Sequence, residues 1–199
     1  ISQLLSYERA LWQRGIRNIA GIDEAGRGPL AGPVVAAAVI FPPDVFITGI
    51  NDSKKIPHKK RNELFSVIKE ESVAFAIGMV CEKTIDHINI LQASFEAMRL
   101  ALEELDVHPQ HVLVDGRSVP NLPCRQTAIV KGDQKSFSIA AASIVAKLTR
   151  DKMMETYDKM YPQYGFSRHK GYCTRAHVAA LRKYGLSPIH RRSFKVKGL

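Results

Sequence analysis

The sequence lacks any hydrophobic run approaching the roughly 20 apolar residues that a membrane-spanning helix requires, so we expect no membrane contact. Its first five residues lack the basic region and apolar core of a signal peptide, and there is no initiating Met. We therefore expect a cytoplasmic protein whose sequence is clipped at this end. Cysteine is scarce, and Cys81, Cys124 and Cys173 have no paired spacing. This pattern indicates a reducing compartment and no disulfide framework.

Acidic residues are absent from positions 159–199, although this segment contains ten of the 29 Lys and Arg residues. Residues 1–158 carry 19 charges of each sign, so the whole net charge of +10 lies in the last 41 positions. The same segment holds six Tyr and Phe residues. Basic side chains interleaved with aromatic rings suit phosphates together with bases or sugars, which favours a nucleic-acid partner. A solvated basic tail is the alternative.

Hydrophobic periodicity predicts an α/β fold. Strand-like apolar runs occur at 18–24, 33–41, 73–81, 111–116 and 126–130, and helical spacing occurs at 3–14, 57–71, 89–105, 136–160 and 174–184. A tight connection joins the first two strands, so we expect them to be antiparallel. Strand and helix alternate in the second half, which favours parallel pairing there. Small residues at 140–143 predict that the long helix lies close against the sheet.

The stretch Ile22–Pro29 places two adjacent carboxylates, Asp23 and Glu24, at the end of an apolar strand. Burying unpaired charge is costly, and a hard divalent cation offsets that cost by binding carboxylate oxygens. Gly26 and Gly28 lack Cβ atoms, which lets a ligand approach the backbone, and Arg27 between them can reach a phosphate. A hairpin turn with a solvated acidic tip is the alternative for this stretch alone.

Acidic residues follow two later strands as well, since Asp115 ends 111–116 and Asp133 follows 126–130. Ligands in α/β sheets gather at the carboxyl ends of strands, so we expect the four carboxylates to converge. Converging carboxylates repel one another unless cations hold them, and two ions about 3.5–4 Å apart are typical of phosphoryl-transfer sites. For the single residues, a turn at Asp115 and a helix N-cap at Asp133 are the alternatives.

The helix predicted over 136–160 carries a polar face near the end that holds Asp133. That face contains Ser136, Ser143, Lys147 and Arg150 at helical steps. Such a stripe can contact a phosphate backbone, and an ordinary solvated face is the alternative.

Five separated motifs resemble bacterial type 2 ribonuclease H over residues 20–194. They are GIDEAGRGPLAGP at 21–33, DSKK at 52–55, LVDG at 113–116, KGDQKSFSIAAASIVAK at 131–147 and YPQYGFSRHKGY at 161–172. The resemblance implies a ribonuclease H-like fold with a mixed five-stranded sheet, a catalytic domain over 1–160 and a basic helical substrate-binding region over 161–199. It also implies cleavage of the RNA strand of RNA/DNA hybrids and nicking of duplex DNA at embedded ribonucleotides, with Mg²⁺ or Mn²⁺.

Carried over by position, the resemblance assigns roles to thirteen residues. The catalytic metal ligands are Asp23, Glu24, Asp115 and Asp133, with Asp23 bridging two ions. The loop Gly26-Arg27-Gly28 senses the ribonucleotide through its 2′-hydroxyl, and Tyr172 stacks on the following deoxyribose. The remaining substrate contacts are Lys54, Ser136, Lys147, Arg150 and Lys170. One departure is Cys173, which stands where the family commonly has Gly, and we expect it to alter the loop that holds Tyr172.

The mechanism implied is hydrolysis assisted by two metal ions, in which water attacks the phosphate 5′ to a ribonucleotide and leaves 5′-phosphate and 3′-hydroxyl ends. We expect a monomer that acts in RNA primer removal and ribonucleotide excision repair. Another metal-dependent nuclease of the superfamily, such as a junction resolvase or an exonuclease, is one alternative. A non-catalytic nucleic-acid-binding module is another, but it leaves the four acids unexplained.

Overall fold

Five strands form one mixed sheet in the computed structural model, which describes residues 3–43, 45–50 and 56–195. The strands are β1 (Ile19–Ala25), β2 (Val34–Ile40), β3 (Ala74–Val80), β4 (His111–Asp115) and β5 (Arg125–Ile129), in the spatial order β3-β2-β1-β4-β5. The antiparallel partners are β1 with β2 and β2 with β3, while β1, β4 and β5 run parallel. The predicted antiparallel and parallel halves are therefore confirmed.

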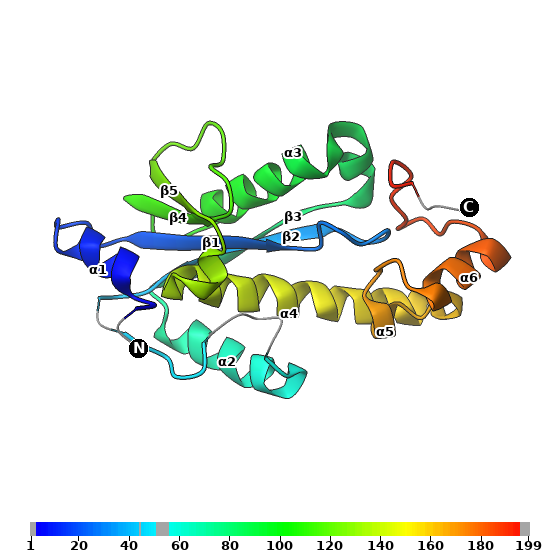
Figure 1. The fold of residues 1–199 in the computed structure, drawn as a ribbon, viewed down its shortest axis with the longest axis horizontal. Coiled ribbons are helices and arrows are strands. Elements are labelled where there is room, and N and C mark those ends of the chain that lie inside the picture. Colours follow the sequence, from blue (N-terminus) through cyan, green and yellow to red (C-terminus); the bar gives the residue numbers. More distant parts are fainter. Residues whose placement is uncertain (1–2, 44, 51–55, 196–199) are drawn as a thin grey trace.

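Helices cover both faces of this sheet (Figure 1). They are α1 (Ser6–Trp12), α2 (His58–Glu71), α3 (Glu82–Glu103), α4 (Phe137–Met160), α5 (Phe166–His169) and α6 (Arg175–Tyr184), with short 3₁₀ turns η1 (Gly132–Gln134) and η2 (Pro162–Tyr164). α3 lies on one face and α4 on the other, with α2 outside α4. Among the described helices, none has both the length and the hydrophobicity needed to cross a membrane.

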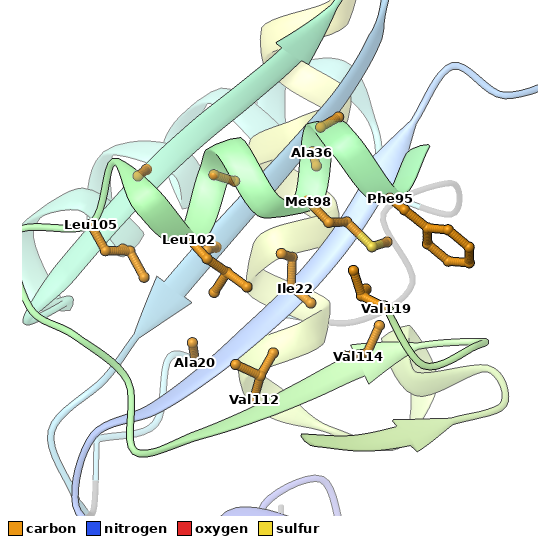
Figure 2. Close-up of a cluster of buried hydrophobic side chains, with 14 of the residues drawn as sticks. Ala20, Ile22, Ala36, Phe95, Met98, Leu102, Leu105, Val112, Val114 and Val119 are labelled. Atoms are coloured by element: carbon orange, nitrogen blue, oxygen red, sulfur yellow. The ribbon is translucent and has the colours of Figure 1, made fainter. Parts of the chain in front are cut away.

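The central strand β2 is buried along its whole length because helices pack on both of its faces. Ala36 and Ala38 belong to the apolar cluster under α3, and Ala37 and Val39 belong to the cluster under α4. Figure 2 shows the first cluster, in which side chains of α3 lie over Ile22 and its neighbours in the sheet. A strand buried on both faces reads as a continuous apolar run, which explains why the sequence revealed it so clearly.

The start of α4 lies close against β1, as its small residues predict. A Cβ atom built on Gly21 would stand 2.1 Å from the carbonyl carbon of Ser138, so this position accepts no side chain. Ala140 and Ala141 are fully buried one turn further along. This close approach brings the side of α4 that carries Ser143 to the carboxyl end of β1.

Helix α3 begins seven residues earlier than the predicted start at 89. Its backbone kinks at Asn89, whose φ of 67° and ψ of 164° are not helical. The Asn89 side-chain oxygen accepts hydrogen bonds from the backbone N–H groups of Leu91 and Gln92, at 3.0 and 3.2 Å. The predicted start is therefore the capped start of the second segment, and residues 82–88 form a preceding segment that the apolar pattern did not reveal.

The basic region that follows α4 packs against the turn after β1. Leu30 donates its N–H to the carbonyl of Gly171 at 2.8 Å, and Gly32 donates to the carbonyl of Ile189 at 2.8 Å. An apolar cluster joins Leu30 and Ala31 to side chains of η2, α5 and α6. Residues 161–195 therefore share a core with the turn that carries the Gly-Arg-Gly sequence.

Candidate active site

Two carboxylates lie side by side where β1 and β4 end. The parallel register pairs Ile22 with Val114, so Asp23 and Asp115 follow at the same level on neighbouring strands. Both residues line a cavity of about 380 Å³. Its lining also includes Glu24, Ala25, Gly26, Arg27, Gly28, Arg61, Ser143, Lys147, Arg150 and Tyr172. Three of the four predicted acids thus reach one cavity.

Burial raises the pKa of Asp23 well above its usual value, and the nearby charges of Glu24 and Asp115 raise it further. Two hydrogen bonds to Asp23 lower its pKa. One comes from the Ser143 side chain, and the other comes from the backbone N–H of Glu24, which lies 2.7 Å from Asp23 Oδ1. Burial also raises the pKa of Glu24, against the lowering effect of Arg27, whose Nη1 donates to Glu24 Oε1 at 3.2 Å. These carboxylates destabilise one another's charge, and an oxygen-only donor set of this kind fits Mg²⁺ or Mn²⁺.

Asp133 lies in η1, directly after β5, and its side chain is buried. The neighbouring Gly132 donates its backbone N–H to Asp115 Oδ1 at 2.6 Å, so η1 is hydrogen-bonded to the carboxylate of Asp115. Ser136, and not Asp133, caps α4. Asp133 is absent from the cavity lining, and within the described ranges no group of three or more His, Cys, Asp or Glu side chains has the arrangement of a metal site. The structure therefore assembles three predicted ligands and leaves the fourth buried next to the Gly132 contact.

The Gly-Arg-Gly loop forms the side of the cavity nearest Tyr172. Gly26 has a φ of +100°, and a Cβ atom there would stand 2.1 Å from Arg150 Nε. At Gly28 a Cβ atom would meet only Tyr172 Cε1, at the ordinary van der Waals distance of 3.5 Å, so this glycine faces the tyrosine ring. Tyr172 itself is 46% exposed. The loop backbone and the tyrosine ring therefore border the same space.

Arg150, a predicted phosphate contact, lines the cavity, and its guanidinium is buried. It donates three hydrogen bonds of 3.0 Å to the carbonyl oxygens of Pro33, Lys170 and Ala31. Burial lowers the pKa of Arg150 to about 10, so it stays charged at neutral pH. Arg150 thus uses three of its five N–H donors to hold the backbone that forms the cavity wall.

Ser136 was predicted to contact the substrate, but its side chain is fully buried and lies outside the cavity lining. Its hydroxyl donates to Glu8 Oε1 at 2.6 Å and accepts from the Ile139 N–H at 3.3 Å. Helical spacing grouped Ser136 with Lys147 and Arg150, but Ser136 lies at the start of α4, where α1 covers it.

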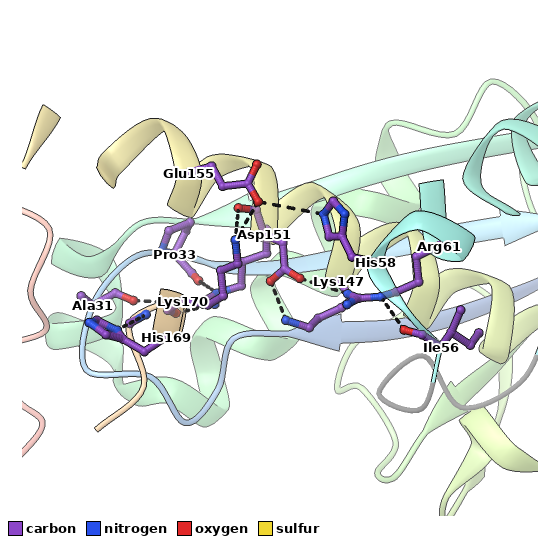
Figure 3. Close-up of polar contacts among 12 residues, drawn as sticks. Ala31, Pro33, Ile56, His58, Arg61, Lys147, Asp151, Glu155, His169 and Lys170 are labelled. Carbon is purple, nitrogen blue, oxygen red and sulfur yellow. Dashed lines mark hydrogen bonds and ion pairs between the residues drawn. The ribbon is translucent and has the colours of Figure 1, made fainter. Parts of the chain in front are cut away.

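Two cations at the cavity are held by one buried acid. Asp151 accepts from Lys147 Nζ and, at 3.0 Å, from Arg61 Nη1 (Figure 3). Lys147, a predicted substrate contact, lines the cavity. Sequence reasoning missed Arg61 and Asp151. The i, i+4 spacing of Lys147 and Asp151 gave a usable signal for their pair, whereas Arg61 comes from α2 and gave none.

The remaining predicted contacts lie in different places. Lys170 Nζ is 2.7 Å from Glu155 Oε1 (Figure 3) and is not among the residues that line the cavity. Lys54 and the rest of 52–55 lie outside the residues that the structure describes. Cys173 is exposed beside Tyr172. Of the predicted substrate contacts, the Gly-Arg-Gly loop, Lys147, Arg150 and Tyr172 thus line the cavity.

Comparison with known proteins covers nearly the whole chain. The sequence model of the ribonuclease HII family matches residues 20–197. Ribonuclease HII of Caldanaerobacter subterraneus subsp. tengcongensis is 53% identical over 197 residues, which make up 99% of this chain and 82% of that protein. The Moorella thermoacetica ribonuclease HII is 55% identical over 195 residues, covering 98% of this chain and 95% of that protein.

Solved structures share the fold. Ribonuclease H2 from Pyrococcus horikoshii has a TM-score of 0.75 and 29% identity, covering 89% of this chain and 94% of that one. Ribonuclease HII from Archaeoglobus fulgidus, solved in complex with PCNA, has a TM-score of 0.72 and 25% identity, covering 90% of this chain and 96% of that one. The cavity residues and positions 161–197 of the basic C-terminal region lie within the part of the chain that the family model matches.

Proposed function

The chain belongs to the ribonuclease HII family, whose members are endonucleases that act on the RNA of RNA/DNA hybrids, and we propose that it also nicks duplex DNA on the 5′ side of a single embedded ribonucleotide. The observation that carries this proposal is the shared cavity: the Gly-Arg-Gly backbone and the Tyr172 ring border the same space as Asp23 and Asp115. A substrate phosphate at the carboxylates would place the neighbouring sugars against those two groups.

The two sugar contacts differ in chemistry. Backbone groups at Gly26 and Gly28 can hydrogen-bond a 2′-hydroxyl, which is the group that distinguishes RNA from DNA. The ring of Tyr172 can stack only on a sugar whose face is free of a 2′-hydroxyl. Because both groups line the same cavity, they can contact neighbouring sugars of one strand, and the pair then favours an RNA-to-DNA step read in the 5′ to 3′ direction.

The carboxylates of Asp23, Glu24 and Asp115 would hold the divalent ions on which the family depends, and we assign Asp133 as a fourth ligand or as a support for Asp115. Two ions bound there would supply Lewis-acid stabilisation of the phosphate and a nucleophilic water. Arg61 and Lys147 add positive charge at the cavity for a non-bridging phosphate oxygen. No histidine is among the residues that line this cavity in the described chain, so the chain offers no imidazole base.

The test compares a DNA duplex that contains one ribonucleotide with an all-RNA/DNA hybrid, with Mg²⁺ or Mn²⁺ added and after chelation. We expect cleavage of both, 5′-phosphate and 3′-hydroxyl ends at the single ribonucleotide, and no cleavage of either after chelation. Cleavage of the hybrid alone contradicts the proposal.

Tyr172→Ala separates the sugar contact from general binding. We expect it to lower kcat/KM at the single ribonucleotide more than on the hybrid, where the next sugar is RNA. Tyr184→Ala is the matched control, because Tyr184 is a similarly exposed tyrosine in the basic region that does not line the cavity. Equal loss on both substrates for Tyr172→Ala would make Tyr172 a general binding residue.

We propose roles in RNA primer removal and ribonucleotide excision repair for a cytoplasmic monomer, since both processes present RNA-to-DNA steps. The Archaeoglobus fulgidus relative was solved with PCNA, so a protein partner that brings the enzyme to DNA is compatible with this role.

A further inference from the structure

Residues 187–191, which follow α6, contact both of the elements that border the sugar-binding side of the cavity. Ala31 and His190 form an isolated antiparallel bridge. Arg191 donates its backbone N–H to the carbonyl of Leu30 at 2.8 Å. The segment is therefore paired with the turn that begins at Gly26. From this segment the Arg191 side chain reaches the Gly-Arg-Gly loop, and the His190 side chain reaches His177.

Arg191 holds the Gly-Arg-Gly loop by three carbonyl oxygens. Its Nη2 donates to Gly26 at 2.6 Å, its Nη1 to Arg27 at 3.1 Å and its Nε to Gly32 at 2.9 Å. The side chain is buried. A planar guanidinium with donors in a rigid fork fixes the relative position of carbonyls at both ends of the loop, which an ammonium group does not do.

His190 is connected to Tyr172 through a second histidine. The backbone N–H of Ser187 donates to His190 Nδ1 at 2.8 Å, so the proton of the neutral imidazole is on Nε2. That atom lies 2.9 Å from His177 Nε2, which must accept. His177 Nδ1 therefore carries its proton and donates to the carbonyl of Tyr172 at 2.9 Å. The hydrogen-bond directions form one consistent chain from Ser187 to Tyr172.

Ring packing fixes this chain in place. The His177 ring stacks on His169 with centroids 4.4 Å apart and an interplanar angle of 16°. Phe166 lies against His177 and His190, each at 5.6 Å between centroids. His177 and His190 are both buried. The imidazoles consequently have little freedom, and the position of Tyr172 follows theirs.

We propose that His190 and Arg191 are specificity-determining positioning residues, which set the distance between the ribose-reading loop and the Tyr172 ring. Arg191 positions the loop, and His190 positions Tyr172 through His177. Because the two residues are adjacent in the chain, the spacing of the two readers is set by one peptide unit. This inference rests on the proposed function, in which the readers contact adjacent sugars. Displacements of about 1 Å in such sites cost up to about a hundredfold in rate.

The test measures kcat/KM on a duplex with one ribonucleotide and on an all-RNA hybrid for two variants at position 190. His190→Gln retains an N–H donor near Nε2, whereas His190→Asn retains only an acceptor near Nδ1 for Ser187. We expect His190→Asn to lower the preference for the single ribonucleotide about tenfold, as suits the loss of one buried hydrogen bond. We expect His190→Gln to restore most of it. Equal preference in both variants and wild type overturns the role of His190.

A double-mutant cycle with Tyr172→Ala distinguishes positioning from general stability. If His190 acts through Tyr172, His190→Asn should cause no further loss of preference in the Tyr172→Ala background, whereas additive losses overturn the proposal. Should His190→Asn fail to fold, His177→Leu removes the donor to the Tyr172 carbonyl and gives the same readout. Melting temperatures are recorded for each variant.

Arg191→Lys tests the other half of the pair, with Arg192→Lys as the matched control because Arg192 is exposed. We expect Arg191→Lys to lower kcat/KM on both substrates at least tenfold, since each presents a ribose, and Arg192→Lys to leave it unchanged. No loss for Arg191→Lys overturns its role. If Tyr172→Ala lowers the preference for the single ribonucleotide and His190→Asn does not, the positioning inference is overturned and the proposed function stands. Equal loss on both substrates for Tyr172→Ala overturns the junction reading itself and the inference with it.

Discussion

We predict that Gly28→Ala lowers cleavage without lowering stability, because the new methyl group meets only the Tyr172 ring and occupies a part of the cavity that the substrate needs. The Cβ position at Gly28 meets only Tyr172 Cε1, at 3.5 Å, which is an ordinary van der Waals distance. Unlike Gly26, Gly28 does not have a positive φ. The folded protein therefore accommodates alanine at this position without a change in its backbone.

For Gly28→Ala we expect a gain in the free energy of unfolding and a loss in kcat/KM. Replacing glycine by alanine at a compatible backbone conformation stabilises a protein by about 0.4–1 kcal/mol, because the unfolded chain loses conformational freedom. For a chain of this size that raises the melting temperature by about 1–4 °C. Displacing a ribose by about 1 Å costs about a hundredfold in kcat/KM, which corresponds to about 2.7 kcal/mol of transition-state stabilisation.

Gly26→Ala is the matched control, since it adds the same methyl group two residues away. Its Cβ would stand 2.1 Å from Arg150 Nε and 2.8 Å from the Pro33 carbonyl, and φ there is +100°. We expect a loss of stability of several kcal/mol, visible in thermal denaturation. Cleavage of both substrates by Gly28→Ala within about twofold of wild type would show that the ribose does not approach at Gly28.

Three further predictions concern the acids, the surface charge and acid stability. Asp115→Asn should lower cleavage at least tenfold yet leave the melting temperature nearly unchanged, because its amide oxygen still accepts from the Gly132 N–H; retention of more than about a tenth of the rate would contradict a metal-ligand role. Replacing the exposed Arg168 and Arg175 by Gln should reduce the slope of log affinity against log salt by up to about two, measured by fluorescence anisotropy on a hybrid, and an unchanged slope would place the phosphate contacts elsewhere. Burial lowers the pKa of His190 to about 4, and burial also lowers that of His177. Since the unfolded chain takes up these protons near pH 6.5, the free energy of unfolding should be highest above pH 6.5 and fall by about 2 kcal/mol as the pH drops toward 4, and a flat urea-denaturation profile over that range would contradict the buried neutral pair.

The strands and their pairing were predictable because the sheet is buried by helices on both faces. Burial of β2 by α3 and α4 produces a continuous apolar run, and such runs identify strands without any structure. The first segment of α3, residues 82–88, was missed because it ends at a non-helical Asn89 and its one buried side chain is Ile85. Its two apolar positions, Ile85 and Ile88, are too few for a periodicity from which to predict a helix.

The roles of side chains on α4 depend on which elements pack over them, and hydrophobic periodicity does not contain this information. Helical spacing predicts Ser136, Lys147 and Arg150 on one side of α4, and of these Lys147 and Arg150 line the cavity. It cannot show that the start of this side is covered by α1, or that carbonyls converge on Arg150. The acids Asp23 and Asp115 were easier to find, because strand ends that meet at one edge of a sheet are a local consequence of topology.

Arg191 was the hardest residue to identify, because in the sequence it resembles its nine basic neighbours in 159–199. Its three acceptors lie about 160 residues away in the chain, so no local pattern predicts them. Only the folded structure separates a buried basic residue from the exposed ones that can attract phosphates.

The choice of carbonyl acceptors for Arg150 and Arg191 has an electrostatic consequence for the cavity. Carboxylate partners would neutralise these buried guanidinium groups, whereas carbonyl oxygens satisfy their donors and leave the positive charge. Burial lowers their pKa values to about 10 and about 9, so both remain charged at neutral pH. The positive charge lies behind the Gly-Arg-Gly loop, on the sugar side of the cavity, while the acids lie at the strand ends. A polyanionic strand is therefore attracted to the loop independently of the cations that the acids require, which lets substrate binding and metal binding be lost separately.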